Sequence, residues 1–245
     1  MSDALLTVAG LGKRFGGFIA LDGIDLAVES GERVGLIGPN GSGKSTLVNC
    51  LSGILRNEEG SVHFAGAAID GLPAHRRTHL GLARSFQLPK PFGSLSVAEN
   101  LRIPLLYTVD GRNGVHLSEG DIAQRCEALL AMVALEGKAR ARPRDLTQIE
   151  MRKLELARAV AAAPKLLIAD EAMAGLSHSE VDDIIALLLK LNQAGIAVIL
   201  IEHIMRAVMS FSERLVVLVA GRKIADGPPQ EVVNNPEVVR AYLGE

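Results

Sequence analysis

The chain has 245 residues, of which 48% are hydrophobic, enough for one sizeable core in one large domain or two small ones. Its 26 basic and 28 acidic side chains give a formal charge of −2, so no bulk field draws it to nucleic acid or anionic lipid. The longest apolar runs, such as LVVLVA and IIALLL, are far shorter than the roughly 18 to 20 residues of a membrane span, so the chain is not expected to cross a bilayer alone.

The first ten residues, MSDALLTVAG, contain neither a basic region nor a long apolar segment. We therefore expect no secretory signal and a cytoplasmic location. Cys50 and Cys126 are the two cysteines, and they have no paired spacing. Small buried hydrophobic residues are a simpler interpretation of them than a disulfide or a metal site.

The first 66 residues are rich in β-forming segments. LLTVAG, GIDLAV, RVGLIG and SVHFAG are predicted strands, and STLVNCLSGIL, which follows GPNGSGKST, is a predicted helix. The pattern from residue 89 to 163 is helical instead, with an apolar face in LLAMVAL. Ser/Thr residues followed three positions later by an acidic residue predict capped helix starts at Ser96 and Ser118.

The stretch LTQIE, residues 146–150, begins another predicted helix. Thr147 and Glu150 fit a capping box, and first-turn amides at such a helix start can also serve an anion from another molecule. Next come LLIAD, a helix capped at Ser177, AVILIEH, a short helix and LVVLVAG, an alternation typical of a parallel sheet. Residues 221–245 are predicted to hold a turn-rich link and two short helical pieces.

The strongest chemical signal is GPNGSGKST, which fits the phosphate-loop pattern G-x-x-x-x-G-K-[ST] between a strand and a helix. Gly41 and Gly43 let successive amides face phosphates, Lys44 places a charge between the β and γ groups, and Ser45 is a candidate Mg²⁺ ligand. A flexible glycine turn is the alternative, but it leaves Lys44 unexplained. The candidate ATP-binding residues are Gly38, Pro39, Asn40, Gly41, Ser42, Gly43, Lys44, Ser45 and Thr46.

Two acids and a histidine end later apolar strands. In KLLIADE, Asp170 is placed to hold magnesium and Glu171 to polarise an attacking water, whereas a solvated strand end is the less specific alternative. His203 ends AVILIEH, where an imidazole can reach the γ-phosphate at the same sheet edge, although a lone histidine is more often structural.

The order of these motifs resembles the ATPase subunit of an ATP-binding cassette (ABC) transporter over essentially all 245 residues. GPNGSGKST corresponds to Walker A, LIADE to Walker B, Gln87 in ARSFQLPKPF to the Q-loop and His203 to the H-loop. The resemblance implies ATP and Mg²⁺ as cofactors, with Glu171 as general base, His203 as γ-phosphate contact and Gln87 as sensor. Ser45, Gln87 and Asp170 would hold the metal. Phe15 resembles the aromatic residue that stacks on adenine, Phe18 competes with it, and core packing is an alternative for both.

LTQIE occupies the position of the family's LSGGQ signature, whose helix start binds the γ-phosphate held by the opposite subunit. Thr147 keeps the hydroxyl of the signature, but Gln148 and Ile149 replace both glycines. The five signature positions are Leu146, Thr147, Gln148, Ile149 and Glu150. DEA replaces the usual DEP, and Ser177 stands where the D-loop typically ends in Asp. These departures put the activity of one composite site in doubt.

The resemblance implies an α/β fold. It consists of a P-loop (RecA-like) core with a mixed or parallel sheet, an N-terminal antiparallel β part and an inserted α-helical subdomain. Residues 1–245 would form one ABC ATPase domain. Ranges 1–88 and 164–220 would be the nucleotide-binding core, 89–163 the helical subdomain with the signature, and 221–245 a tail.

Within the family, the short spacer after the signature, AGL after Walker B and the tail NNPEVVRAYLGE are similar to ATPases of importers for branched-chain amino acids and related hydrophobic or amide substrates. An ATPase for lipopolysaccharide or lipid transport is one alternative, and a weakly hydrolysing regulatory subunit, suggested by LTQIE, is another. The implied partners are membrane permease subunits, a second ABC ATPase in a homo- or heterodimer and, indirectly, a periplasmic binding protein, but no nucleic acid. The chain would lie peripherally on the inner face of the membrane.

Overall fold

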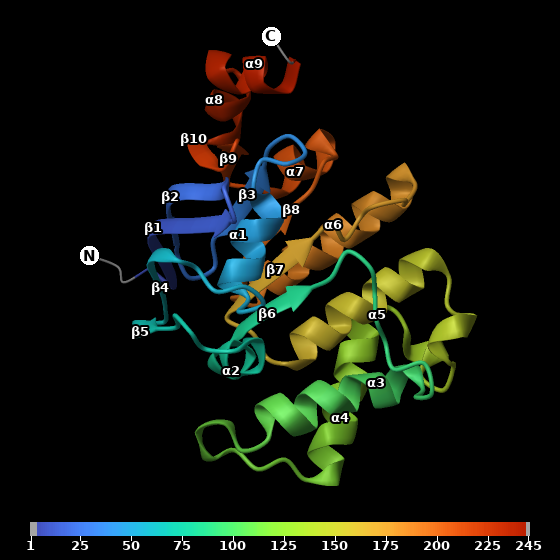
Figure 1. Cartoon of the computed structure of the whole chain (residues 1–245). Helices are drawn as coiled ribbons and strands as arrows, with labels where there is room; N and C mark the ends of the chain where they lie inside the picture. The colour runs from blue at the N-terminus through green and yellow to red at the C-terminus, as the bar shows by residue number, and fades with distance from the viewer. Residues whose placement is uncertain (1–3, 244–245) are drawn as a thin grey trace.

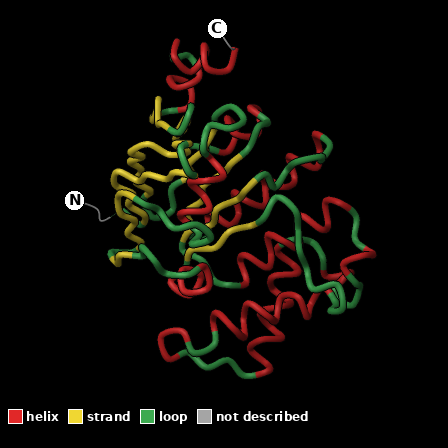
Figure 2. The backbone as a smooth tube through the Cα atoms, viewed as in Figure 1, coloured by secondary structure: helices red, strands yellow, loops and turns green. Residues whose placement is uncertain are grey.

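A computed structural model describes residues 4–243, in which two sheets stack beside a group of helices (Figures 1 and 2). The antiparallel sheet contains, in spatial order, β2 (Phe18–Val28), β1 (Leu6–Phe15), β4 (Glu59–Phe64) and β5 (Ala67–Ala68). The larger sheet contains β10 (Arg222–Gly227), β9 (Arg214–Val219), β3 (Arg33–Ile37), β8 (Ala197–Ile201), β7 (Leu166–Asp170) and β6 (Leu82–Ser85). The expected α/β fold with a separate antiparallel part is confirmed.

The centre of the larger sheet is parallel and buried. β3 pairs in parallel with both β8 and β9, and β7 pairs in parallel with both β8 and β6. Every residue of β7 and β8 is buried. Such continuous apolar strands are typical of a parallel sheet that is covered on both faces.

The predicted helices occur in the expected order along the chain, and the structure adds α2, for which no prediction was made. α1 (Lys44–Leu51), α2 (Ala74–Leu80), α6 (His178–Gln193) and α7 (Met205–Phe211) alternate with the strands, and α8 (Pro229–Val233) and α9 (Pro236–Leu243) form the tail. Residues 89–163 contain α3 (Val97–Pro104), η1 (Leu105–Val109), η2 (Arg112–Gly114), α4 (Glu119–Met132), η3 (Glu136–Lys138), η4 (Pro143–Asp145) and α5 (Gln148–Ala161). Among the described residues, no helix combines the length and the apolar character that a membrane crossing requires.

Helix starts are where the sequence was most informative. Both hydrogen bonds of a capping box are present at Ser96, Ser118, Thr147 and Ser177, so these four predicted starts are confirmed. A capping box satisfies otherwise unpaired amides with side chains only three residues away, so it is encoded locally.

The helices of residues 89–163 share a hydrophobic core with one face of the larger sheet. Leu101 of α3, Leu130 of α4 and Leu154 of α5 belong to the same buried cluster as Leu167 of β7 and Leu200 of β8. A second cluster joins the other face of the sheet to α1 and the antiparallel sheet. The ranges expected for the subdomains stay a prediction, because the packing is continuous across them.

The tail corrects one expectation, since residues 222–227 form strand β10 and not a turn-rich link. Ala220 and Gly221 both have positive φ, at 47° and 80°, and make a two-residue turn that returns the chain antiparallel to β9. Positive φ at both central residues is the geometry of a tight hairpin. β10 is an edge strand whose side chains are half-buried or exposed, which suits the polar sequence RKIADG. This strand was not predicted because it lacks the apolar pattern of the others.

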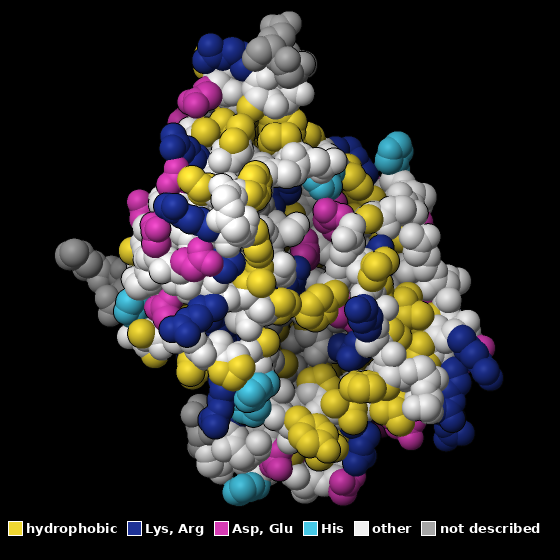
Figure 3. Space-filling view, viewed as in Figure 1, with side chains coloured by type: hydrophobic (Ala, Val, Ile, Leu, Met, Phe, Trp, Pro, Cys, Tyr) yellow, Lys and Arg dark blue, Asp and Glu magenta, His cyan; other side chains and the backbone are white. Residues whose placement is uncertain are grey.

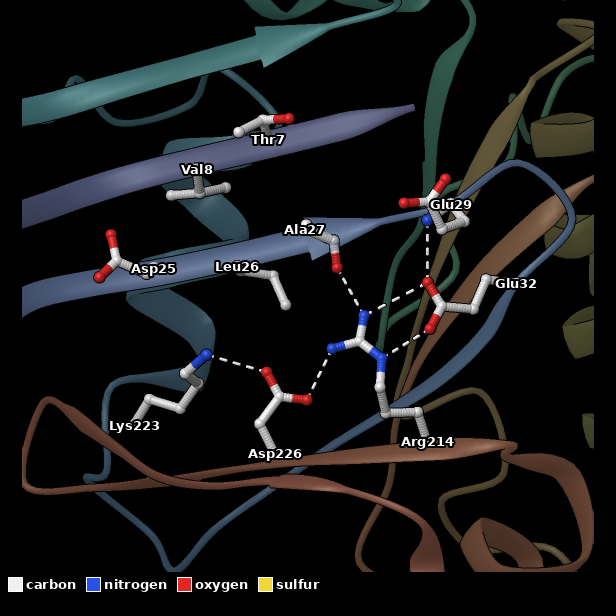
Figure 4. Close-up of a pocket in the computed structure, with 10 residues that line it drawn as sticks. All are labelled: Thr7, Val8, Asp25, Leu26, Ala27, Glu29, Glu32, Arg214, Lys223 and Asp226. Atoms are coloured by element: carbon white, nitrogen blue, oxygen red, sulfur yellow. Dashed lines mark hydrogen bonds and ion pairs between the residues drawn. The ribbon is translucent and has the colours of Figure 1, made fainter. Parts of the chain in front are cut away.

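A half-buried guanidinium joins the two sheets (Figure 4). Arg214, at the start of β9, donates to Glu32 Oε1 at 2.6 Å, to Asp226 Oδ1 at 2.6 Å and to the Ala27 carbonyl of β2 at 2.5 Å. Burial raises the pKa of Asp226, but hydrogen bonds from Lys223 and Arg214 outweigh it and leave that pKa below its usual value. These ion pairs line the pocket drawn in Figure 4, together with Asp25 and Glu29, and the Arg214 contacts fix β2 against β9 and β10.

Candidate functional site

The loop between β3 and α1 requires glycine at two positions. A Cβ on Gly38 would lie 2.1 Å from the Leu218 carbonyl oxygen, and one on Gly43 would lie 2.8 Å from the Ala20 carbonyl oxygen. Gly43 also has φ 105°, a left-handed value that favours glycine, and it directly precedes α1. Backbone packing, besides any ligand, thus explains why these glycines stand where they do.

Lys44 lies inside this loop. Its Nζ donates to the Gly38 carbonyl at 2.7 Å and to the Pro39 carbonyl at 3.0 Å, and the residue is only 7% exposed. Burial lowers the pKa of this ammonium group, while the charges of Glu171 and Asp170 raise it. The loop therefore holds a cation at the point where the helix dipole also favours an anion.

A pocket of roughly 240 Å³ opens beside the loop. It brings together most of the candidate ATP-binding residues with Glu171 and His203, and its lining is Phe18, Ala20, Asn40, Gly41, Ser42, Gly43, Lys44, Ser45, Thr46, Glu171 and His203. Of the two aromatic candidates, Phe18 lines this pocket. Phe15 is paired with Phe18 across the β1–β2 hairpin and lies outside the lining described.

Glu171 is the centre of the polar contacts. Its Oε1 lies 3.1 Å from His203 Nε2, and its Oε2 accepts a hydrogen bond from Gln87 Nε2. Glu171 has φ 46°, an uncommon value for a residue with a Cβ, and its amide donates to the Ile201 carbonyl at 2.9 Å. The three residues expected to act on water and phosphate thus meet through one carboxylate.

Asp170 has a partner that the sequence did not reveal. Arg84 Nη2 donates to Asp170 Oδ2 at 2.6 Å, and both side chains are 11% exposed. The same guanidinium donates to Asn49 Oδ1 of α1 at 2.7 Å and lies 5.1 Å from the Phe86 ring centroid. Arg84 therefore ties the end of β7 to α1. A single arginine in the strand LARS carries no motif that would have identified it.

Glu202 is a second residue near the site that the sequence did not reveal. It is 3% exposed, and its carboxylate accepts from the amides of Met173 at 2.8 Å and His203 at 3.3 Å. Burial raises its pKa, and the two amides oppose that effect. The side chain fixes the turn after Glu171 against the start of the His203 segment. Its place in ILIEH, beside the expected histidine, was the only available signal.

LTQIE forms the start of α5. Glu150 Oε2 accepts from the Thr147 amide at 2.8 Å, and Lys138 lies 3.6 Å from the same carboxylate. The Thr147 amide above all, and then the charge of Lys138, hold the pKa of Glu150 below its usual range. Gln148 Nε2 donates to the Ala174 carbonyl at 3.4 Å, and Ile149 packs half-buried against the core. A negative charge and a branched side chain therefore stand at this helix start.

Comparisons with known proteins agree with the motifs. A family model described as ABC transporter matches residues 21–174, and one described as branched-chain amino acid ATP-binding cassette transporter matches residues 222–245. The high-affinity branched-chain amino acid transport ATP-binding protein BraF of Pseudomonas aeruginosa is 37% identical over 100% of both chains. The probable branched-chain amino acid transport ATP-binding protein LivG of Archaeoglobus fulgidus is 34% identical over 98% of this chain and 95% of its own.

Solved structures show the same architecture. The ADP conformation of MJ1267, an ATP-binding cassette of an ABC transporter, matches with a TM-score of 0.87 and 31% identity, covering 99% of this chain and 100% of that chain. A dimeric post-hydrolysis state of the ATP-binding cassette MJ0796, bound to ADP and Pi, matches with a TM-score of 0.81 and 26% identity over 91% and 98% of the two chains.

The β1–β2 hairpin gives a matched pair of variants for the adenine contact. We expect Phe18→Ala to weaken ADP binding roughly 3- to 10-fold, because an aromatic stacking contact contributes about 0.5–1.5 kcal/mol. Phe15→Ala should change it less, since only Phe18 of the two lines the pocket. Calorimetric titration of both proteins with ADP measures this. A larger loss in Phe15→Ala would assign the stacking role to Phe15.

Proposed function

The chain belongs to the ABC transporter family of ATP-binding cassettes, and from this premise we propose that it is the ATP-hydrolysing subunit that powers an importer of branched-chain or related hydrophobic amino acids or amides. The observation that carries the ATPase function is the meeting of Gln87 and His203 on the Glu171 carboxylate beside the phosphate loop. The substrate class rests on the full-length similarity to BraF and LivG and on the family match of the tail.

Each site residue has a role that its position supports. The loop amides and Lys44 bind the phosphates of ATP. Glu171 accepts a proton from the attacking water, and the left-handed backbone at this residue directs its carboxylate toward the pocket. His203 contacts the γ-phosphate, and Gln87 joins the nucleotide site to the segment that follows β6.

The residues present suit Mg²⁺, which prefers oxygen ligands. Ser45 supplies a hydroxyl in the pocket lining, and Asp170 supplies a carboxylate at the end of β7. Within residues 4–243 the hydrogen bond of the Asp170 carboxylate is to Oδ2, which leaves Oδ1 for a metal. Gln87 supplies an amide oxygen. When bound, the metal neutralises phosphate charge.

The segment after Gln87 is the proposed groove for a permease helix. Leu88 is 69% exposed and Phe92 is 45% exposed, and the two residues flank the prolines at 89 and 91. Hydrophobic side chains also gather on the neighbouring surface over α3 and α4 (Figure 3). Exposed apolar side chains of this size are typical of a protein interface. Docking there would hold the chain on the cytoplasmic face of the membrane, with a periplasmic binding protein reached only through the permease.

The altered signature supports a pairing with a different ATPase subunit. In a head-to-tail dimer, the start of α5 serves the nucleotide of the partner, so LTQIE affects the partner's ATP and this chain's own loop meets the partner's signature. Ile149 adds bulk where glycine allows close approach, and Glu150 brings a negative charge. The same features favour, as a second candidate, a subunit that binds ATP and hydrolyses it weakly as a homodimer.

Lys44 and Glu171 should separate binding from hydrolysis. Lys44→Ala removes the phosphate contact and should weaken ATP binding. Glu171→Gln keeps the shape but lacks the base, so it should retain ATP and accumulate a closed dimer, measured by size-exclusion chromatography with ATP and by phosphate release. Turnover at the parent rate in Glu171→Gln would show that the base is another residue.

Phe92 tests the groove. We expect Phe92→Cys to cross-link to a permease subunit in assembled membranes, because its side chain is half-exposed in the proposed groove. The natural cysteines are buried and provide little background. Tyr107→Cys, more exposed on η1, is the control for nonspecific capture. Labelling confined to this chain, or equal cross-linking from both positions, would place the permease elsewhere.

Ile149 tests the signature. Ile149→Gly should raise the steady-state ATPase rate of the isolated chain, although it loses roughly 0.5 kcal/mol of helix propensity as well as partial core packing. Rates are therefore compared at equal folded fraction, with Ile149→Val as the control that keeps the β-branch and should retain the parent rate. An unchanged or lower rate in the glycine variant would mean that residue 149 does not limit the site.

A further inference from the structure

Residues 86–92, here called the glutamine segment, run from β6 toward α3 and include Gln87. Much of the segment is exposed, yet its backbone is held on one side by α5. The α5 residues involved are Arg152, Glu155 and Arg158, spaced three apart and so on one face of the helix. The hydrogen bonds of the cap join Thr147 to Glu150, and these three side chains instead contact groups outside the cap.

Arg152 holds the main chain of Gln87 itself. The residue is 8% exposed, its Nη1 donates to the Gln87 carbonyl, and its Nη2 donates to the Ala174 carbonyl at 3.2 Å. Ala174 lies three residues after Glu171. The Arg152 guanidinium therefore connects the main chain of Gln87 to the turn that follows Glu171.

Glu155 faces the amides on either side of Gln87. It is 6% exposed, and its Oε2 accepts from Arg158 Nη1 at 2.8 Å. Burial raises its pKa, whereas Arg158 and the nearby backbone amides of Phe86 and Lys90 lower it. Arg158 in turn donates to the Lys90 carbonyl at 3.1 Å, and its Cζ lies 5.3 Å from the Phe92 ring centroid. The Glu155–Arg158 ion pair on α5 thus lies against the glutamine segment, and its arginine binds the Lys90 carbonyl.

The far end of the segment is held by α3. Asn100, which is fully buried, accepts from the Phe92 amide at 2.8 Å and donates to the Phe92 carbonyl at 3.1 Å. By contrast, Arg84 on the preceding strand binds Asp170 and Asn49. The contacts of the chain thus change between Arg84 and Gln87. The Arg84 side chain binds β7 and α1, whereas the Gln87 main chain is held by α5.

We propose that Arg152 and Glu155, with Arg158 as the counter-charge, are positioning residues for Gln87: they fix its main chain so that its amide reaches the Glu171 carboxylate. The inference rests on the proposed ATPase function. Burying charged side chains on backbone groups contributes little net stability, but it defines geometry closely, because each donor and acceptor is lost if the segment shifts.

Amide hydrogen exchange on the full-length chain tests the geometry without relying on catalysis. Glu155→Ala should speed exchange at Phe86 and Lys90 by about 10-fold or more, because it removes the buried carboxylate that faces these amides and that holds Arg158 on the Lys90 carbonyl. Glu155→Gln keeps the shape and one acceptor oxygen and should give an intermediate effect; it also serves if the alanine variant folds poorly. Lys153→Gln, which removes a charge from the same helix but from a contact with Asp183, should exchange at the parent rate.

A double-mutant cycle tests whether Glu155 acts through Gln87. Glu155→Ala should lower kcat by about 10-fold with little change in KM for ATP, and should lower it by less than about 2-fold in a Gln87→Ala background. Equal losses in both backgrounds, or unchanged exchange at Phe86 and Lys90, would overturn the proposal. If exchange changes as expected but the parent chain has no ATPase activity, with or without its partners, the proposed function fails and the positioning contact stands.

Discussion

Everything at the site depends on the parallel register of β3, β8 and β7. Ile201 of β8 pairs with Leu36 of β3 on one side and with Asp170 of β7 on the other, so three strands end at the same level. The segments that follow them carry the phosphate loop, Glu171 and His203. The Glu171 amide extends the pairing by donating to the Ile201 carbonyl. A slip of one residue in β8 would reverse which side chains face each layer, and it would separate these groups.

The sequence predicted those parts of the structure that are encoded locally. The caps at Thr147 and Ser177 need only residues three positions apart, and the phosphate loop needs only its own glycines. β10 was not predicted, because this edge strand has no apolar pattern. Only the turn at Ala220 and Gly221 indicated that the chain returns along β9. The bond from Arg152 to the Gln87 carbonyl joins residues 65 apart, and no spacing rule anticipates it. The sequence did not decide between Phe15 and Phe18, because only the position of the β1–β2 hairpin beside the pocket places Phe18 in its lining.

Charged side chains are buried around this site to an unusual degree for their type. As whole residues, Lys44, Arg152, Glu155, Asp170 and Glu202 are all less than 10% exposed. Buried charges are uncommon unless they are paired, and replacing a buried pair with hydrophobic residues is often neutral or stabilising. Stability alone therefore does not account for them. Each one instead contacts a main-chain group or a partner charge that determines where a functional residue lies, as Glu202 does for the turn after Glu171.

Two functions proposed for α5 favour different residues in its first turn. Close approach of the helix start to a phosphate favours glycine, whereas a charged face that must hold the glutamine segment favours a rigid helix. Gln148 and Ile149 satisfy the second demand: the Gln148 side chain reaches the Ala174 carbonyl, and Ile149 packs on the core. Arg152 binds that same Ala174 carbonyl one turn later, so two turns of α5 fix a single point beyond Glu171. Gln148 and Ile149 thus strengthen the contact of α5 with the turn after Glu171, and in the proposed head-to-tail dimer they would hinder approach to the nucleotide of the partner.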